Sequence, residues 1–165
     1  MEHEHKGARN EDLAFMAAAI ELARDGVQRN EGGPFGAVIV KNGSIVGKGY
    51  NRVISTKDPT AHAEIVAIRA AAAQLGEFHL TGGTLYTTCE PCPMCLAASY
   101  WSRIERVFYA LTRSDAEALG FSDAEIHNEI SKPVNQRKIP LTQCGRAQAL
   151  GLSDLWLHKT DKTEY

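Results

Sequence analysis

Two short groups of potential metal ligands constrain this chain more than any other feature. His62 stands in the sequence HAE, and Cys92 and Cys95 stand in PCPMC, which begins about thirty positions further along. Each group opens a stretch with helical periodicity, TAHAEIVAIRAAAAQLG and PCPMCLAASYW. If the three side chains bind one ion, the fold must bring the first turns of these two helices together.

The donor set indicates a catalytic zinc ion. One imidazole and two thiolates are three zinc ligands, which leaves the fourth tetrahedral position for water. Cys92 and Cys95 lie three positions apart and therefore share one helix face, where the helix dipole favours thiolates. His62 and Glu64 can both face one ion only if they occupy the end of their helix. Glu64 is then placed to take a proton from zinc-activated water.

Other interpretations of the cysteines have to be considered. A Cys-x-x-Cys pair alone also suits redox chemistry or half of a structural zinc site, but the sequence holds no second such pair to complete four ligands. Cys89 is either a fourth ligand or a thiol buried behind the site, and its place at the end of an apolar strand favours burial. Cys144 has no partner motif and is expected to be a core or surface thiol.

The pattern around these motifs predicts a mixed α/β fold. Residues 11–29 carry apolar side chains at spacings of three and four and therefore predict an amphipathic helix. The runs FGAVIV and SIVGKGY flank Asn42-Gly43, which is typical of a tight β-hairpin. Strands GTLYTT and RVFY alternate with the two helices described above. We expect a three-layer α/β/α sandwich with a mixed sheet, and a ligand site where helices begin beyond the strand ends. The apolar face of the first helix is predicted to comprise Leu13, Met16, Ile20, Ala23 and Val27.

Length and charge limit the possible partners. A chain of 165 residues can bury one core, so residues 1–165 are expected to form a single domain, with a break at Lys132-Pro133 and a last helix from Gly145 to His158. Lys and Arg number 18 against 20 Asp and Glu, and no basic run exceeds Arg137-Lys138, which argues against a nucleic-acid partner. No apolar stretch could serve as a signal or span a bilayer, so we expect a cytoplasmic protein without a membrane partner.

Several segments resemble a known family. PTAHAEIVAIR and TTCEPCPMCLAASYWSRIERVFYA are similar to the cytidine deaminase superfamily. The segments GGPFGAVIV, DPTAHAE, ALGFSD and the terminal KTEY resemble its bacterial guanine deaminase branch. The resemblance implies that zinc binds His62, Cys92 and Cys95, and that Glu64 shuttles protons during conversion of guanine to xanthine and ammonia.

The same resemblance implies a substrate site and a dimer. Asn51 would bind the purine edge, Phe35 would pack near the base, and Asp123 would act as a second acid, although Ser122 replaces the first member of an acidic pair common in this branch. Without the resemblance, Asp123 would be read as a helix N-cap and Asn51 as a turn residue. The resemblance also implies a homodimer whose segment 145–165 crosses to the partner. The remaining residues implied to contact substrate are Ala63 and Tyr165.

The sequence leaves several functions open beside guanine deamination. Guanosine, other aminopurines or triazines would suit the same chemistry. The tRNA adenosine deaminases share the HAE and PC-x-x-C motifs, although the absence of a basic stripe speaks against a tRNA substrate. A structural zinc module is the non-enzymatic alternative, and such a module would have no use for Glu64.

Overall fold

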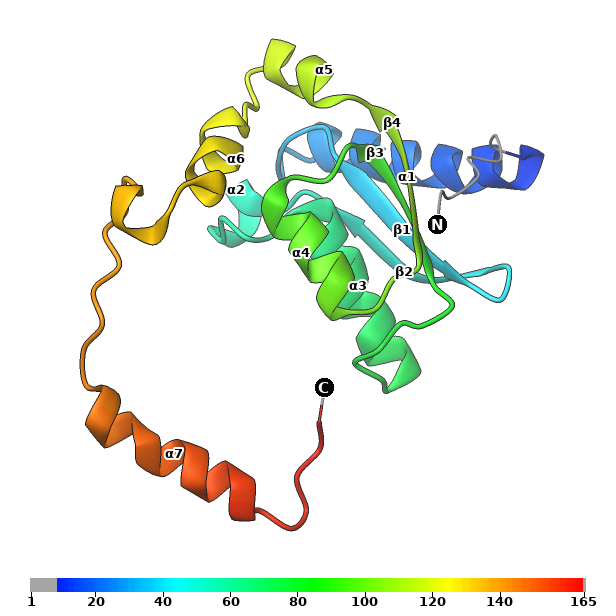
Figure 1. The fold of residues 1–165 in the computed structure, drawn as a ribbon. Helices are drawn as coiled ribbons and strands as arrows, with labels where there is room; N and C mark the ends of the chain where they lie inside the picture. Colours follow the sequence, from blue (N-terminus) through cyan, green and yellow to red (C-terminus); the bar gives the residue numbers. More distant parts are fainter. Residues whose placement is uncertain (1–8, 165) are drawn as a thin grey trace. The chain divides into compact units, whose positions relative to one another are not determined.

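A four-stranded mixed sheet forms the centre of the protein in the computed structural model, which describes residues 9–164 (Figure 1). The strands are β1 (Gly36–Lys41), β2 (Ser44–Tyr50), β3 (Thr84–Cys89) and β4 (Arg106–Leu111). Their order in the sheet is β2-β1-β3-β4. Strand β1 is antiparallel to both β2 and β3, whereas β3 and β4 are parallel. The predicted mixed sheet is therefore confirmed.

The predicted hairpin joins β1 to β2. Asn42 and Gly43 both have positive φ angles, 53° and 72°, which is the backbone that a two-residue turn of this type requires. A positive φ is costly for most residues but acceptable for Asn and Gly. The Asn-Gly pair thus fixes where the chain reverses and brings the end of β2 back beside the start of β1.

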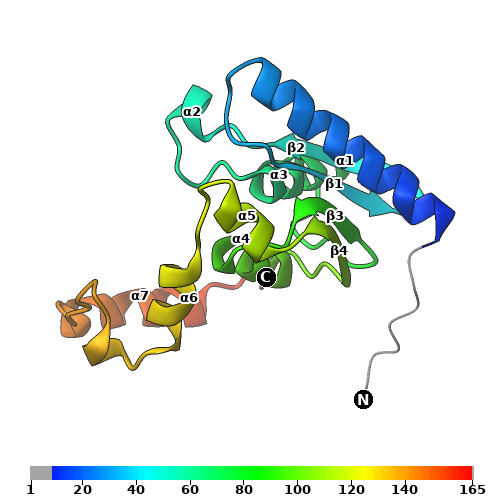
Figure 2. The same cartoon turned by 90° about the horizontal axis from the view of Figure 1, so that it is seen from above.

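Helices cover both faces of the sheet, which confirms the three-layer architecture (Figure 2). Helix α1 (Asn10–Gln28) packs against the face that carries Val38, Val40 and Tyr86. Helix α3 (Ala63–Leu75) packs against the opposite face, together with α4 (Pro93–Trp101) beside it. Successive strand residues point to opposite faces, so the near-continuous apolar runs of β1 and β3 supply both layers.

The face of α1 that contacts the sheet matches the predicted one only in part, since Met16 and Ala23 pack there as predicted. Leu13, Ile20 and Val27 are 60%, 40% and 44% exposed, although they were expected on the buried face. The sheet instead meets a stripe of mostly small residues. The buried residues of α1 are Asp12, Ala19, Ala23 and Gly26.

Close approach of the two backbones explains this difference. A Cβ atom on Gly36 of β1 would lie 2.1 Å from the main-chain oxygen of Ala19, so the helix and strand touch almost directly. Only small side chains fit between them. The larger residues Ile20 and Val27 are displaced sideways, where they line an apolar cleft of about 610 Å³ with Leu111 of β4.

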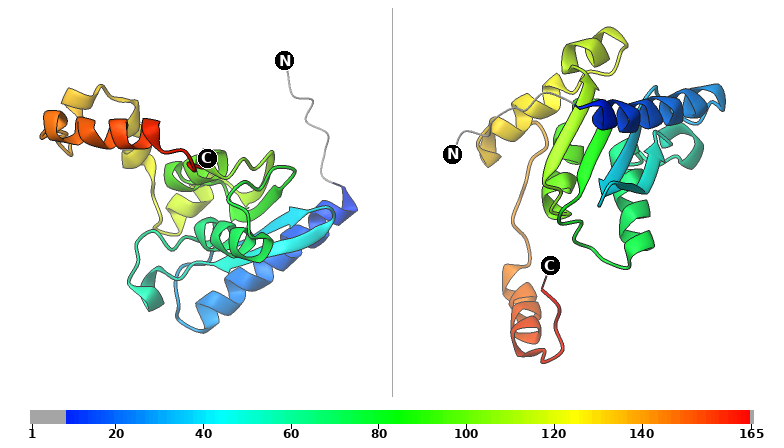
Figure 3. Two further views of the ribbon diagram at one scale, coloured as in Figure 1. Left: turned by 90° about the horizontal axis from the view of Figure 1, so that it is seen from below. Right: turned by 90° about the vertical axis from the view of Figure 1, so that its right-hand side faces the viewer.

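The chain divides into two compact units between Asp123 and Ala124. The first also contains the short helices α2 (Val53–Thr56) and α5 (Arg113–Ala118). The second contains α6 (Ala124–Ser131), the 3₁₀ turn η1 (Val134–Gln136) and α7 (Arg146–His158), with an extended segment before α7 (Figure 3). The predicted helix from Gly145 to His158 and the break at Pro133 are confirmed, whereas a single domain over residues 1–165 stays a prediction.

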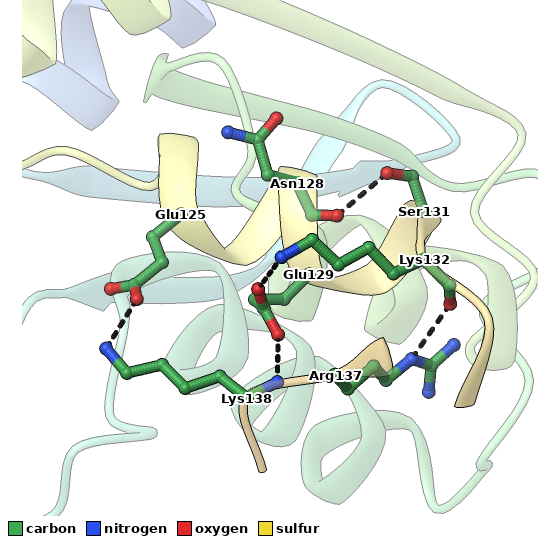
Figure 4. Close-up of polar contacts among 7 residues, drawn as sticks. All are labelled: Glu125, Asn128, Glu129, Ser131, Lys132, Arg137 and Lys138. Atoms are coloured by element: carbon green, nitrogen blue, oxygen red, sulfur yellow. Dashed lines mark hydrogen bonds and ion pairs between the residues drawn. The ribbon is translucent and has the colours of Figure 1, made fainter. Parts of the chain in front are cut away.

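Polar contacts hold the start of the second unit together (Figure 4). The Lys138 ammonium lies 2.7 Å from the Glu125 carboxylate, and the main-chain N–H of Lys138 donates to Glu129. Glu129 also pairs with Lys132, and Arg137 donates to the Lys132 carbonyl. These contacts fold the segment after α6 back onto that helix.

Within residues 9–164, none of the helices is both long enough and apolar enough to cross a bilayer.

A buried carboxylate ties α1 to the sheet. The Tyr86 hydroxyl donates to Asp12 across 2.6 Å, and the main-chain N–H of Arg9 donates to the other carboxylate oxygen across 2.7 Å. The Tyr86 ring stacks on Phe108 with centroids 5.1 Å apart. The hydrogen bond from Tyr86, followed by that from Arg9, lowers the pKa of Asp12 below its ordinary value.

Replacing Asp12 by Asn should destabilise the protein at neutral pH by about 1–3 kcal/mol, because a buried charged hydrogen-bond acceptor becomes neutral. Since the folded-state pKa of Asp12 lies below the unfolded value, its contribution is complete above about pH 4 and is lost as the pH falls through the folded value. Urea unfolding of both proteins between pH 7 and pH 3 measures this. Exposed Glu11, changed to Gln, is the matched control. A stability gap of constant size down to pH 3 would contradict the prediction.

Candidate metal centre and active site

The first turns of α3 and α4 carry the predicted ligands. His62 is the N-cap residue of α3 and Cys92 is the N-cap residue of α4, each with extended backbone angles. Cys95 lies in the first turn of α4, and Pro93 occupies a first-turn position where a missing N–H costs no helical hydrogen bond. Glu64 lies in the first turn of α3. The predicted location of both motifs at helix starts is therefore confirmed.

The structure brings the three ligand atoms together. The Nδ1 atom of His62 lies 3.6 Å from the Cys92 sulfur and 3.5 Å from the Cys95 sulfur. A tetrahedral zinc ion with ordinary bond lengths holds its nitrogen and sulfur ligands about 3.6 Å apart. All three ligand atoms lie within 4.8 Å of one another. These separations suit a shared ion, and they identify Nδ1 as the histidine atom that would bind it.

The electrostatics of the cluster also favour a cation. Contact with the Cys95 thiol lowers the pKa of Cys92 to about 4. The contact with Cys92, together with burial and the nearby Glu64 carboxyl group, raises the pKa of Cys95. Ionising both thiols and the carboxyl group at this spacing would bring like charges together, and a dication between them would remove that repulsion and favour the thiolates. One imidazole and two cysteine sulfurs are a donor set that zinc prefers.

Glu64 is the acid beside the ligands. Its side chain is 6% exposed, and the Cys95 thiol lies 3.5 Å from one carboxylate oxygen. Burial, the largest cause, raises the pKa of Glu64. A carboxyl group whose pKa rises toward neutrality can both accept and return a proton, which suits a general acid and base.

Cys89 is not part of the metal group. Among the described residues that group comprises His62, Cys92 and Cys95. The Cys89 thiol is 6% exposed and donates to the main-chain oxygen of Thr112 across 3.7 Å. Burial, followed by the charge of Glu64, raises its pKa to about 11. These observations favour a buried thiol over a fourth metal ligand at Cys89. Cys144 is exposed, so of the two expected alternatives, a core or a surface thiol, it is the surface thiol.

Three predicted substrate residues are connected to one another near the start of α3. Asn51 directly follows β2, is 6% exposed, and its main-chain N–H donates to the Phe35 oxygen across 2.9 Å. Phe35 packs against the core cluster that contains Ala63. Ala63 is completely buried, so its methyl group is unavailable to a ligand. The same burial includes its main-chain N–H, which lies in the first turn of α3, where helical N–H groups have no partner within the helix.

The two remaining predicted site residues, Asp123 and Tyr165, follow α5 in the sequence. Asp123 is half buried, and its charge is among the causes that raise the pKa of Cys89, after burial, Glu64 and Glu90. The charges of Asp123 and Glu64 therefore both act on the Cys89 thiol. Tyr165 falls outside the described residues.

Phe121 is a neighbour of the site that the sequence did not identify. Its ring meets the Phe35 ring edge to face, with centroids 4.9 Å apart. A Cβ atom on Gly33 would lie 2.8 Å from the Phe121 ring, so Gly33 lies directly against this pair. The only available signal was the position of Phe121 in the ALGFSD run.

Fold and site together define the class of protein. Residues 9–111 match the model of the cytidine and deoxycytidylate deaminase zinc-binding region, so the chain belongs to the cytidine and deoxycytidylate deaminase family. It is a zinc-binding deaminase by this membership, and the metal group lies within the matched residues.

The similarity to guanine deaminases extends beyond that region. The chain is 48% identical to guanine deaminase of Bacillus subtilis (strain 168) over 151 residues, which cover 92% of this chain and 97% of the relative. A crystal structure of guanine deaminase from that species matches with 47% identity and a TM-score of 0.89, covering 96% of this chain and 99% of the other. The expected resemblance to this branch is therefore confirmed.

More distant similarities are shorter. A structure of guanine deaminase from Nitrosomonas europaea has 32% identity and a TM-score of 0.65, and the match covers 78% of this chain and 70% of that one. A tRNA-specific adenosine deaminase of Aquifex aeolicus (strain VF5) is 45% identical over 96 residues, or 58% of this chain and 63% of the relative.

Two buried cysteines allow a matched test of the metal group. Changing Cys95 to Ala should reduce bound zinc from about one ion per chain to nearly none, because two ligands cannot hold the ion tightly. Changing Cys89 to Ala should leave the zinc content unaltered, since its thiol bonds to the Thr112 carbonyl. Elemental analysis after dialysis measures both, with circular dichroism as the control for folding. Folded Cys89→Ala protein without zinc would contradict this assignment.

Proposed function

We propose that this protein hydrolyses guanine to xanthine and ammonia. The observation that carries the proposal is the similarity to Bacillus subtilis guanine deaminase in both sequence and structure over nearly the whole chain. The family model ends at residue 111, but the match to Bacillus subtilis guanine deaminase continues to cover 92% of the chain. Matches to tRNA deaminases are weaker: a tRNA-specific adenosine deaminase of Buchnera aphidicola is 42% identical over 80% of the chain, and a tRNA:A34 deaminase structure has a TM-score of 0.62 over 82%, against 0.89 over 96% for the guanine deaminase structure. The higher identity, the wider coverage and the higher structural similarity together favour guanine as the substrate.

The proposed reaction adds water to C2 of guanine and removes the C2 amino group as ammonia. Zinc held by His62, Cys92 and Cys95 would supply a Lewis acid that makes water acidic near neutral pH. Glu64 takes a proton from the attacking water as the carbon–oxygen bond forms, and then gives a proton to the adjacent ring nitrogen. The C2 hydroxyl then loses its proton, the amino group gains one, and breaking the carbon–nitrogen bond releases ammonia and forms the C2 carbonyl of xanthine. The burial that raises the pKa of Glu64 suits this double role.

The remaining residues would orient the base. Asn51 binds the purine edge, and Phe35 packs against the ring system. The main-chain N–H of Ala63 contacts the base at the start of α3, where helical N–H groups have no internal partner. Asp123 holds the N–H groups of the departing amino group and passes it a proton. Its electrostatic effect on Cys89 supports a position near Glu64.

We also propose a homodimer in which the segment from residue 145 crosses to the partner and Tyr165 closes the partner's site. The support comes from the second unit, residues 124–164, whose large apolar side chains are exposed in the single chain. Isolated apolar residues on a surface are ordinary, but a dense set on one short segment marks an interaction surface. The exposed set comprises Ile126, Ile130, Val134, Ile139, Leu141, Leu150, Leu152, Leu155, Trp156 and Leu157.

The metabolic role and the cellular location of the protein stay predictions from the sequence. Guanine deamination belongs to purine breakdown, and a cytoplasmic location would give the enzyme access to its free base. Neither a polynucleotide nor a membrane is expected as a partner.

Replacing Glu64 by Gln should lower ammonia release from guanine by roughly 10²- to 10⁴-fold, because the proton shuttle is lost. Zinc content should stay at the wild-type level, since Glu64 is not among the three ligands. Wild-type protein should release ammonia from guanine faster than from guanosine, adenine, cytosine, cytidine or tRNA. Full activity of the zinc-loaded Glu64→Gln protein would refute Glu64 as the proton shuttle. Absence of ammonia release by the wild-type protein from every substrate would favour the structural zinc module, and faster turnover of tRNA would refute guanine as the substrate.

Deleting residues 162–165 should reduce guanine turnover by roughly tenfold or more while thermal unfolding stays unchanged, because loss of a closing group admits water to the site. Co-expression with full-length Glu64→Gln protein provides a sharper test of crossing tails. The truncated chain then contributes Glu64 and the other chain contributes the tail, so mixed dimers should recover activity that neither protein has alone. Failure of the isolated mixed dimer to recover activity would contradict the crossing arrangement.

A further inference from the structure

The side-chain amide of Asn51 is held in one orientation by the main chain. Its Oδ1 atom accepts hydrogen bonds from the N–H of Gly33 across 3.3 Å and from the N–H of Val53 across 3.2 Å. A carbonyl oxygen has two lone pairs, and both are used here. Among residues 9–164, no partner is recorded for the amide nitrogen, Nδ2.

The opposite orientation of the amide is disfavoured. Rotating it by 180° would turn its NH₂ group toward two main-chain N–H groups, so donors would face donors and both N–H groups would lose their acceptor. Asn51 is 6% exposed, and little water is available there to replace those bonds. An unsatisfied polar group at a buried position is costly. The amide therefore keeps Oδ1 toward the main chain and Nδ2 away from it.

Gly32 allows the loop to approach Asn51 this closely. A Cβ atom on Gly32 would lie 2.2 Å from Oδ1 of Asn51 and 2.3 Å from its main-chain oxygen. The second of these atoms belongs to the backbone and cannot rotate away. Gly32 is therefore needed for steric reasons, whereas Gly33 supplies the N–H donor.

This arrangement is connected to the candidate site on both sides. The main-chain N–H of Asn51 bonds to Phe35, and the N–H of Arg52 bonds to the Ala61 oxygen across 3.0 Å, directly before His62. Asn51 is thus held between the ring that packs beside the site and the start of the metal group. An amide held in this orientation would present its NH₂ group, a hydrogen-bond donor, to a ligand.

We propose that Gly33 and Val53 make Asn51 a hydrogen-bond donor only, so that the substrate must present an acceptor atom to it, and that Gly32 is the positioning residue that permits this arrangement. The inference rests on the proposed function for its ligand, a purine base. Guanine offers the carbonyl oxygen at C6 and the ring nitrogen N7 as acceptors. A base with an amino or C–H group at the facing position would lose the bond and leave Nδ2 buried without a partner.

The test measures coupling between Asn51 and each acceptor. Dissociation constants are determined at pH 8 in the zinc-loaded Glu64→Gln background for guanine, for 7-deazaguanine, which lacks N7, and for 2-aminopurine, which lacks the C6 oxygen. With Asn51 intact, guanine should bind about ten- to a hundredfold more tightly than the analogue that lacks the facing acceptor. With Asn51→Asp, which keeps the acceptor toward Gly33 and Val53 but has no donor, this preference should fall below about twofold.

Two glycine variants separate positioning from general instability. Gly32→Ala should reduce the same preference, because it displaces the Asn51 amide. Gly83→Ala is the matched control, since its Cβ would lie 2.5 Å from the Leu80 main-chain oxygen, a similar overlap at a contact that excludes both Asn51 and α3. Gly83→Ala should keep the preference. The ratio of two dissociation constants is independent of the fraction of folded protein, so partial unfolding does not disturb this comparison.

Clear outcomes would overturn the proposal. Unchanged binding of guanine by Asn51→Asp would show that Asn51 is not a donor to the base. A preference that persists in Asn51→Asp for both analogues would show the same, and persistence in folded Gly32→Ala would remove the role of Gly32. If Gly32→Ala fails to fold, the Asn51→Asp comparison decides the donor role. Absence of ammonia release from guanine by the wild-type enzyme would instead refute the proposed function.

Discussion

The convergence of two helix starts is the constraint on which the rest of this structure depends. His62 and Cys92 cap α3 and α4, and their side chains meet with the Cys95 sulfur at separations that suit a tetrahedral ion. Both helices direct the positive ends of their dipoles toward this cluster, which favours the thiolates there. Glu64 is buried beside the ligands, so one small region concentrates the negative charge that a dication would balance.

Close packing between helices and sheet sets the position of that convergence. A Cβ atom on Gly49 of β2 would lie 2.2 Å from the Ala63 oxygen, and one on Gly47 would meet α3 one turn later. Because these positions have no side chain, α3 lies directly on β2 and its first turn has little freedom to move. On the opposite face, Gly36 gives α1 the same close approach. Thin layers thus hold His62 and Glu64 in place.

Local patterns predicted most of the elements but not every contact surface. The Asn42-Gly43 turn and the two helix starts depend on residues near one another in the sequence, and the structure confirms them. The predicted face of α1 was wrong at Leu13, Ile20 and Val27, because an apolar helix offers several stripes and the close backbone at Gly36 selects the stripe of small residues. No sequence signal identified the pairing of Asp12 with Tyr86, since the two residues lie 74 positions apart.

The sequence alone determined the metal-binding chemistry, because the types and spacing of His62, Glu64, Cys92 and Cys95 already restrict the ion and the acid beside it. Tertiary structure decided which buried cysteine lies with the histidine and which one, Cys89, bonds to a distant carbonyl. It also decided that the Asn51 oxygen is satisfied by main-chain N–H groups. Hydrogen-bond partners and packing distances across the fold depend on where separate segments meet, and no local pattern of residues encodes that meeting.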